Sequence, residues 1–367
     1  MPSVDQISRE LDSFAPPALA AEWDNTGLLL GDAALEVHRV MTCLTLTRDV
    51  AEEAIASNVQ LIVTHHPILF KAIKNLSSQN RDGHLLLRLA RAGIAVYSPH
   101  TRFDNAVDGI NARIARQLGL EQIQPLRIRT GNDQYKLVVF VPETDLERVS
   151  RAMFDAGAGQ IGEYSECSFR LPGVGTFRGS PASNPTIGAK ENFELVAEIR
   201  LEVICQARLL ESIVSAMCKA HSYEEPAYDL YPLKTVSPRS GEGRLGCLPE
   251  KQPFESLFEL AKKIFHVQQL QIVGGQETPI RKVAIACGAA GEFLSDALRK
   301  RADLFITGEM RFHELLAART AGIVVLMPGH YASERPAIEQ LAEWLSGKFP
   351  GIQAFPSRCE SDPLRYA

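Results

Sequence analysis

Four of the nine histidines in this sequence stand directly after apolar runs of strand length. They are His65 and His66 in THHP, His100 in PHTRFD and His330 in PGHYASE. In an open α/β sheet, ligands bind outside the carboxyl ends of the strands. We therefore expect these histidines to converge on one crevice, where imidazoles could bind metal ions or transfer protons.

Two carboxylates accompany these histidines four residues further along the chain. Asp104 shares a predicted loop with His100, and Glu334 follows His330 at the start of a helix whose expected N-cap is Ser333. Imidazole and carboxylate ligands suit zinc, iron or manganese, and these loops contain no cysteine, which argues against a thiolate structural zinc site. Either carboxylate could bridge two ions, as two-metal hydrolytic sites require.

The adjacent pair His65 and His66 favours two ions over one. In extended backbone, neighbouring side chains point in roughly opposite directions, so the two imidazoles would serve two neighbouring metals more naturally than chelate one ion. Pro67 favours an extended conformation at His66 and so helps to hold the two rings apart.

Three further segments carry groups of less specific meaning. Glu309, in TGEMRFHE, could accept a hydrogen bond from a ligand histidine, or be a helix-start acid favoured by the helix dipole. The sequence WDN at 23–25 could wall a pocket, or serve only as turn and core. Backbone N–H groups of GAAG at 288–291 could bind a phosphate, or the segment could be a simple tight turn.

The elements that must position these residues alternate between strand and helix in the first and last thirds of the chain. Strands are predicted at 40–46, 61–63, 95–98, 283–287, 304–307 and 323–327, and helices at 48–57, 83–92, 108–118, 293–300, 312–318 and 337–345. This alternation predicts an α/β fold in which a mostly parallel sheet carries helices on both faces.

The middle of the chain has a different pattern. Strands are predicted at 136–141, 165–171, 175–178, 198–203 and 228–233, and helices at 146–156 and 208–220. Split β-α-β units of this kind predict a ferredoxin-like α+β insert over 126–245. Because the candidate ligands come from both flanking segments and must meet, 1–125 and 246–367 are predicted to form one discontinuous α/β metal-binding domain.

The composition excludes several classes of protein. With 367 residues, 45% of them hydrophobic and 23% charged, the chain can form two or three folded domains and is unlike disordered or collagen-like sequences. A net charge of -5 disfavours nucleic acid as a partner. There is neither a secretory signal nor an apolar run of about 18 residues, and the scattered cysteines suit reduced thiols, so we expect a cytoplasmic protein with no membrane partner.

Seven motifs, taken in order, resemble those of the GTP cyclohydrolase I type II homologues, a family also described as dinuclear-metal-centre hexameric proteins. They are EWDNTGLLLGD, THHP, H-T-x-x-D, HSYEEPAYDLYPL, G-R-L-G, ITGEMRFHE and GHYASE. The resemblance runs nearly end to end and implies two divalent metal ions per subunit and a homo-hexameric toroid. As metal ligands it implies His65, His66, Asp104, His330 and Glu334, with His100 as a neighbouring proton-transfer group.

Two departures from the family pattern lie near these motifs. Members commonly carry H-T-N-L-D where this chain has Arg102 and Phe103 in the middle, and often L-D where it has Leu44 and Thr45. Neither departure strikes a ligand that the resemblance implies, and both could alter substrate preference. In the insert, the resemblance implies that HSYEEPAYDLYPL helps to organise the toroid or its openings, although this segment could equally be a structural turn.

The leading interpretation is a metal-dependent hydrolase that acts on a nucleotide or a related heterocycle, with two ions of zinc, iron or manganese. A bound dication would lower the pKa of its water toward about 7, and His100 or Glu309 could then transfer protons. The alternative is a non-enzymatic metal-handling or regulatory protein that forms a toroidal assembly. A toroidal nucleic-acid clamp is a third interpretation, weakened by the net charge of -5.

Overall fold

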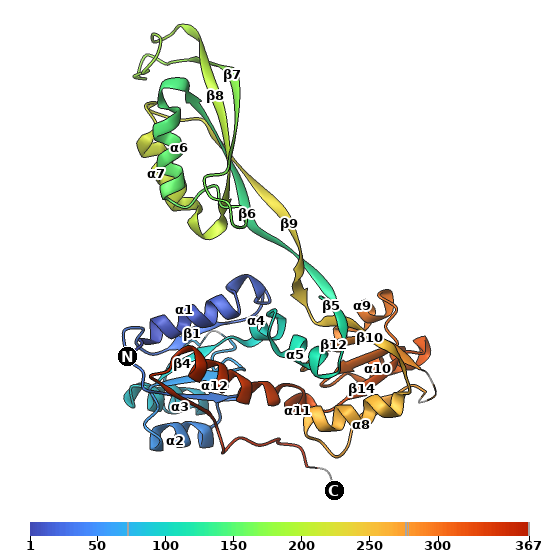
Figure 1. Cartoon of the computed structure of the whole chain (residues 1–367). Coiled ribbons are helices and arrows are strands. Elements are labelled where there is room, and N and C mark those ends of the chain that lie inside the picture. Colours follow the sequence, from blue (N-terminus) through green and yellow to red (C-terminus); the bar gives the residue numbers. More distant parts are fainter. Residues whose placement is uncertain (72, 276, 278, 366–367) are drawn as a thin grey trace. The chain divides into compact units, whose positions relative to one another are not determined.

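A computed structural model describes residues 1–71, 73–275, 277 and 279–365, and for 81, 129–133 and 234–240 it describes the backbone alone. The chain divides into two compact units (Figure 1). The first unit combines Met1–Arg129 with Ser237–Ala367, and the second is Thr130–Val236. Each unit has its own apolar core.

The first sheet of the discontinuous unit has the strand order β1-β4-β3-β2-β15. Its strands are β1 (Gly27–Leu30), β2 (Arg39–Cys43), β3 (Leu61–Thr64), β4 (Ala95–Ser98) and β15 (Gln353–Pro356). All neighbours are parallel except β1, which pairs antiparallel with β4. Helices α2 (Arg48–Ala56) and α3 (Arg81–Arg91) share an apolar cluster with side chains of β2, β3 and β4.

The second sheet of this unit has the order β11-β14-β13-β12-β10-β5. Its strands are β5 (Glu121–Gln124), β10 (Arg244–Gln252), β11 (Gln271–Val273), β12 (Ile280–Ala286), β13 (Leu304–Thr307) and β14 (Val324–Met327). The central three, β12, β13 and β14, are parallel, and the outer pairs are antiparallel. Helices α9 (Leu294–Arg299) and α10 (Phe312–Ala321) pack in a cluster with alternate side chains of these strands.

One large apolar core joins the two sheets. It contains the remaining alternate side chains of both sheets together with residues of α1 (Val4–Phe14), α5 (Ile110–Gln117), α8 (Phe254–Phe265) and α12 (Pro336–Lys348). The predicted α/β class is therefore confirmed. The parallel strands are divided between two sheets because both sets pack their apolar side chains into a core that also holds these four helices.

Two short helices begin where strands end and carry four of the candidate site residues. They are α4 (His100–Asn105), after β4, and α11 (His330–Glu334), after β14. The sequence predicted a loop at 100–104 and an N-cap at Ser333, and both predictions are wrong. Gly329 is the N-cap of α11, with a φ of 100° that residues bearing a side chain rarely adopt, and Ser333 lies inside the helix.

The second unit has the element order and sheet order of a ferredoxin-like fold. Its elements are β6 (Arg127–Pro142), α6 (Leu146–Asp155), β7 (Ser168–Arg178), β8 (Phe193–Gln206), α7 (Leu210–Ala220) and β9 (Tyr228–Glu242), and its strand order is β7-β8-β6-β9. Helices α6 and α7 pack on one face of the sheet. Short 3₁₀ helices lie in this unit at Glu143–Asp145 and Ala207–Leu209, and in the discontinuous unit at Pro17–Leu19 and Gly291–Phe293.

One strand of this unit differs from prediction. The expected break between 165–171 and 175–178 is absent, because β7 pairs with β8 without interruption and Pro172 lies opposite Ile199. A proline is tolerated there because β7 is an edge strand, where a missing N–H group breaks no further pairing. Within the part of the chain that the structure describes, no helix is both long enough and apolar enough to cross a membrane.

Arg244, in the G-R-L-G motif, fixes the end of α4. Its side chain is buried and donates hydrogen bonds to the carbonyls of Gly241 and Gly243 at 3.1 and 2.6 Å, and to those of Asn105 and Ala106 at 2.7 Å each. Burial lowers the pKa of this guanidinium to about 10. Last-turn carbonyls of a helix lack partners within the helix, so Arg244 satisfies groups that would otherwise be buried unpaired.

We predict that Arg244→Met lowers the free energy of unfolding by about 3 kcal/mol, because several buried carbonyls lose a charged donor. Urea denaturation should show a lower midpoint with an unchanged slope. Arg9→Met is the matched control, since Arg9 forms an exposed 2.8 Å pair with Asp5 and should contribute less than about 1 kcal/mol. Equal midpoints for the two variants would contradict the anchoring role of Arg244.

Candidate metal centre

Four of the residues proposed from the sequence, His65, His66, Asp104 and His330, gather around a fifth, Glu334. Ligand atoms of His65, Asp104 and Glu334 lie within 4.8 Å of one another, and so do those of His66, His330 and Glu334. His66 Nε2 is 3.2 Å and His330 Nε2 is 3.3 Å from Glu334 Oε2, whereas His65 Nε2 lies 3.9 Å from Oε1. Glu334 therefore belongs to both groups.

The two adjacent histidines reach different oxygens of this carboxylate. Strand pairing continues past β3, because the N–H groups of His65 and His66 donate to the carbonyls of Cys43 and Leu44 at 2.9 and 2.8 Å. The extended backbone holds the two rings 5.1 Å apart with a 57° angle between their planes. His65 points into the interior and His66 toward the more open group, so the pair offers one imidazole to each group.

The inner group has the properties of a cation site. Both ring nitrogens of His65 are buried without a hydrogen-bond partner in the described structure, and burial lowers the pKa of this imidazole well below its ordinary value. Burial, with the nearby charge of Glu334, raises the pKa of Asp104 to about 7. Among described residues, neither carboxylate is paired with lysine or arginine. A divalent ion would supply the missing positive charge and use the lone pair of a neutral imidazole.

Hydrogen bonds hold the other nitrogens of the two outer histidines. His66 Nδ1 lies 2.7 Å from Thr45 Oγ1, and His330 Nδ1 lies 3.0 Å from Glu309 Oε1. Each bond directs the Nε2 atom of its ring toward Glu334, as outer partners of ligand histidines generally do. Glu309 thus stands where an acceptor for a ligand histidine was expected, and the Thr45 departure places a hydroxyl beside His66.

His100 is held by a carboxylate that the sequence marked only as part of a possible pocket wall. Its Nδ1 lies 2.7 Å from Asp24 Oδ1, and Asp24 Oδ2 accepts the N–H of Thr101 at 3.2 Å. Burial favours the neutral imidazole, but the hydrogen bond to Asp24 and the charge of Asp104 outweigh it and raise the pKa of His100. His65, His66 and His100 also offer ligand atoms within 4.8 Å, so His100 lies directly beside the centre.

The glycine loop after β12 makes room for the carboxylate. Gly288 has a φ of 70°, and a Cβ atom there would lie 2.3 Å from Glu334 Oε1. Its N–H donates to Ser333 Oγ at 2.9 Å, and the N–H of Ala290 donates to the Gly288 carbonyl at 3.1 Å. These two donors are already used within the protein, and the loop makes room for the Glu334 carboxylate.

Other polar residues near the motifs serve structural roles. Arg102, one of the departures from the family pattern, is buried and pairs with Asp12 of α1 at 2.7 Å, away from the centre. Cys287 Sγ lies 3.3 Å from Asp104 Oδ1 and so contacts the centre. His313 packs against Phe312 and does not join either group.

A cavity of about 510 Å³ opens beside these residues. His66, His100, Asp104, His330 and Glu334 line its floor, together with Gly288 and Ala289. Trp23 and Phe70 form an aromatic wall, with ring centroids 5.6 Å apart and 5.9 and 6.2 Å from the His100 ring. Asn25 Nδ2 donates to the Leu69 carbonyl at 2.6 Å and so ties the two aromatic segments together.

We predict that Gly288→Ala weakens zinc affinity by about 10–100-fold, the range for changes to groups that support ligands, because its Cβ would displace Glu334. Gly322→Ala is the matched control, since Gly322 has a φ of 75° with open space around its Cβ position. Competition with a chelating dye measures both affinities. If both variants lost zinc affinity to the same extent, backbone strain at a positive φ, and not displacement of Glu334, would explain the effect.

We also predict that Glu334→Gln removes more metal than His100→Gln. The amide lacks the charge that would balance two dications in a buried setting, whereas His100 is held by Asp24 through Nδ1 and is expected to transfer protons rather than to ligate the metal. Elemental analysis of both purified variants gives the metal content per chain. An empty site in His100→Gln together with two retained ions in Glu334→Gln would reverse the assignment.

The chain resembles known proteins over nearly its whole length. The sequence pattern of the Duf34/NIF3 family, described as NGG1p interacting factor 3, matches residues 2–363. A GTP cyclohydrolase 1 type 2 homolog of Halalkalibacterium halodurans is 36% identical over 358 residues, covering 97% of this chain and 96% of the relative. One from Bacillus subtilis is 34% identical over 364 residues, covering 98% of both.

Solved structures agree with this relationship. A Bacillus cereus protein related to NIF3 superposes with a TM-score of 0.77 at 32% identity, covering 100% of this chain and 99% of its own. A Staphylococcus aureus protein superposes with a TM-score of 0.80 at 25% identity and the same coverage. The resemblance read from the seven sequence motifs is confirmed by these matches, and the chain belongs to the Duf34/NIF3 family.

Proposed function

We propose that this chain is a metal-dependent hydrolase that acts on a nucleotide or a related heterocycle. Two divalent ions of zinc, iron or manganese would be held by the two groups that share Glu334, with His65 and Asp104 in one and His66 and His330 in the other. The donor set of imidazoles and carboxylates suits these metals, and the paired groups suit a two-metal arrangement.

The observation that carries the substrate class is the aromatic wall beside the centre. Trp23 and Phe70 are 61% and 51% exposed, although large apolar side chains are usually covered. Both rings lie next to His100 at the cavity, where a planar heterocycle could stack on them within reach of the candidate ligands. The names of the curated relatives, which refer to GTP cyclohydrolase, support the same class.

The protein's own groups would divide the remaining work. Bound divalent ions would supply Lewis acidity and lower the pKa of a coordinated water toward about 7. Asp24 orients His100 through Nδ1 and leaves the other ring nitrogen free to transfer a proton. Glu309 contacts His330 and not the cavity floor, so its role is to position that imidazole.

One observation favours a second candidate function, in which the protein binds and releases metal without turnover. The side chain of His65 is fully buried, whereas those of His66 and His330 are 27% and 34% exposed. An ion in the outer group would therefore meet solvent and could exchange while the inner ion stays. A metal-handling or regulatory protein, assembled as a homo-hexameric toroid, would use the site in this way.

Turnover assays on a panel of nucleotides, with metal content measured in parallel, separate the two functions. We predict that product formation rises with metal occupancy, and that His100→Gln lowers kcat by about 10²–10⁴-fold while retaining its metal, because a proton-transfer group is lost. Chelation should abolish turnover, and restored zinc, manganese or iron should recover it. Rapid exchange of one ion with no product from any nucleotide would favour the metal-handling function.

We further predict that Phe70→Leu raises KM for an active nucleotide by about tenfold with little change in kcat, because a stacking surface for the ring is lost. Phe312→Leu is the control, since Phe312 is 68% exposed and lies outside the cavity. Steady-state kinetics of both variants provide the comparison. An unchanged KM in Phe70→Leu would exclude the aromatic wall as the recognition surface.

A further inference from the structure

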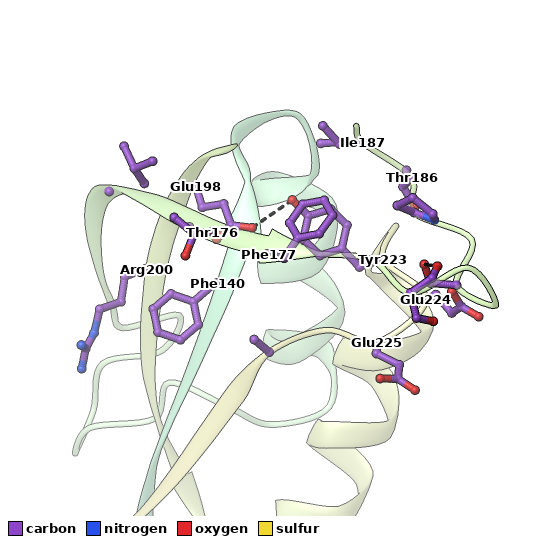
Figure 2. A pocket seen from close by; sticks show the side chains of 18 of the residues that line it. Phe140, Thr176, Phe177, Thr186, Ile187, Glu198, Arg200, Tyr223, Glu224 and Glu225 are labelled. Carbon is purple, nitrogen blue, oxygen red and sulfur yellow. Dashed lines mark hydrogen bonds between the residues drawn. The ribbon is translucent and has the colours of Figure 1, made fainter. Parts of the chain in front are cut away.

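A second and larger cavity lies entirely within the inserted unit. It measures about 890 Å³, and its lining residues run from Phe140 to Ala227 (Figure 2). This volume is within the range of pockets that enclose small molecules. Because no lining residue comes from the discontinuous unit, the cavity is independent of the candidate metal centre.

Hydrogen bonds build one wall of this cavity from two loops. The N–H of Asn184 donates to Glu224 Oε2 at 2.9 Å, and Thr186 Oγ1 donates to the Ser222 carbonyl at 2.7 Å. These bonds fasten the segment after β7 to the turn after α7. The segment 184–186 and the turn at 222–224 therefore hold each other in place along this wall.

The HSYEE motif forms a turn that contributes three residues to the lining of the cavity. His221 Nδ1 accepts the N–H of Tyr223 at 3.0 Å, so its Nε2 carries the proton and donates to the Phe140 carbonyl at 3.0 Å. His221 is buried and serves the turn, whereas Tyr223, Glu224 and Glu225 line the cavity. The motif thus builds a local structure that the metal centre does not use.

The carboxylate of Glu198 lies over Gly175 of strand β7 and, in the part of the chain that the structure describes, is hydrogen-bonded on one side only. Tyr223 donates its hydroxyl hydrogen to Glu198 Oε1 at 2.9 Å, the contact drawn as a dashed line in Figure 2. Glu198 Oε2 lies over Gly175, where a Cβ atom would approach it to 2.1 Å. One oxygen is therefore held by Tyr223, and among the described residues the other has no hydrogen-bond donor.

The charges of the lining favour a cation. Glu198, Glu224 and Glu225 supply three carboxylates, and Arg200 is the one basic residue among the lining residues described. The Arg200 Nε donates to Glu202 at 2.9 Å, so part of its charge is already paired outside the cavity. The cavity therefore carries a net negative charge next to the Glu198 carboxylate.

The apolar part of the lining favours an organic cation over a metal ion. Phe140 and Phe177 contribute aromatic rings, and Leu171, Val174 and Ile187 contribute aliphatic surface. Among the residues described, the three carboxylates do not form a group with ligand atoms within 4.8 Å of one another, so they do not make a coordination sphere. One carboxylate beside an apolar surface matches an ammonium group attached to an apolar body.

We propose that this cavity is a binding site for a small organic cation, whose ammonium group pairs with Glu198 and whose apolar, ring-sized body lies against the aromatic and aliphatic lining. The ligand class is a monoamine with one aromatic or compact aliphatic group. The site is separate from the proposed hydrolase centre and adds a ligand-responsive function to the inserted unit.

Calorimetric titration of the full chain with phenethylamine, 2-phenylethanol and 3-phenylpropionate tests the charge requirement. These probes share a phenyl group and differ in carrying a positive, neutral or negative end. We expect phenethylamine to bind with one site per chain and at least about tenfold more tightly than the alcohol, with the carboxylate weakest. Equal affinity for amine and alcohol, or no amine binding up to about 10 mM, would overturn the proposal.

Three variants locate the binding. Glu198→Gln keeps the side-chain shape and should weaken phenethylamine by about tenfold, and Gly175→Ala should do the same by displacing the carboxylate without changing the charge. Glu211→Gln removes a charge from α7 outside the cavity and should stay within about twofold of the wild type. Circular dichroism of each variant confirms that the fold is retained.

Two results would count against binding of an organic cation in this cavity. Amine binding that is unchanged in folded Glu198→Gln and Gly175→Ala would place the cation elsewhere in the chain. A wild-type assembly that binds no amine and dissociates in Val174→Glu by sedimentation would show that a second copy covers this face. Either result rejects the organic-cation site.

Discussion

The burial of one carboxylate, Glu334, organises the candidate metal centre. Its side chain is 4% exposed, and the imidazoles of His65, His66 and His330 lie within 4 Å of its oxygens. A buried charge is costly unless it is paired, so the ends of β3 and β14 must meet although these strands belong to different sheets. The shared apolar core and Arg244 hold the elements that bring these ends together.

The centre is asymmetric, and its asymmetry follows from depth. The inner group lies against the core, where burial keeps His65 neutral and raises the pKa of Asp104. The outer group meets the cavity, and its imidazoles are oriented by Thr45 and Glu309. Two ions bound in these settings would differ in exchange with solvent, which links the geometry of the site to both of the functions considered.

The inserted unit has a self-contained structure and a cavity of its own. Its helices cover one face of the sheet, and the cavity forms where the loop after β7 is fastened to the HSYEE turn. The two cavities differ in their chemistry. The cavity beside the metal centre combines metal-ligating groups with exposed aromatic rings, whereas the cavity of the insert combines carboxylates with aliphatic and aromatic surface.

The sequence by itself determined the element types and the residue types of the centre, because both are local. The short apolar runs at 95–98 and 304–307, which alternate with predicted helices along the chain, match β4 and β13. Histidines that directly follow such runs mark the ends of the sheets. It did not determine that the parallel strands form two sheets, or that Ser333 lies within α11, since these depend on packing between distant segments. Only the tertiary structure paired Asp24 with His100, 76 residues away, and placed Gly288 against the carboxylate of Glu334. A hydrogen bond or a close steric contact between residues far apart in the chain leaves no periodic pattern in the sequence, so neither could be predicted from it.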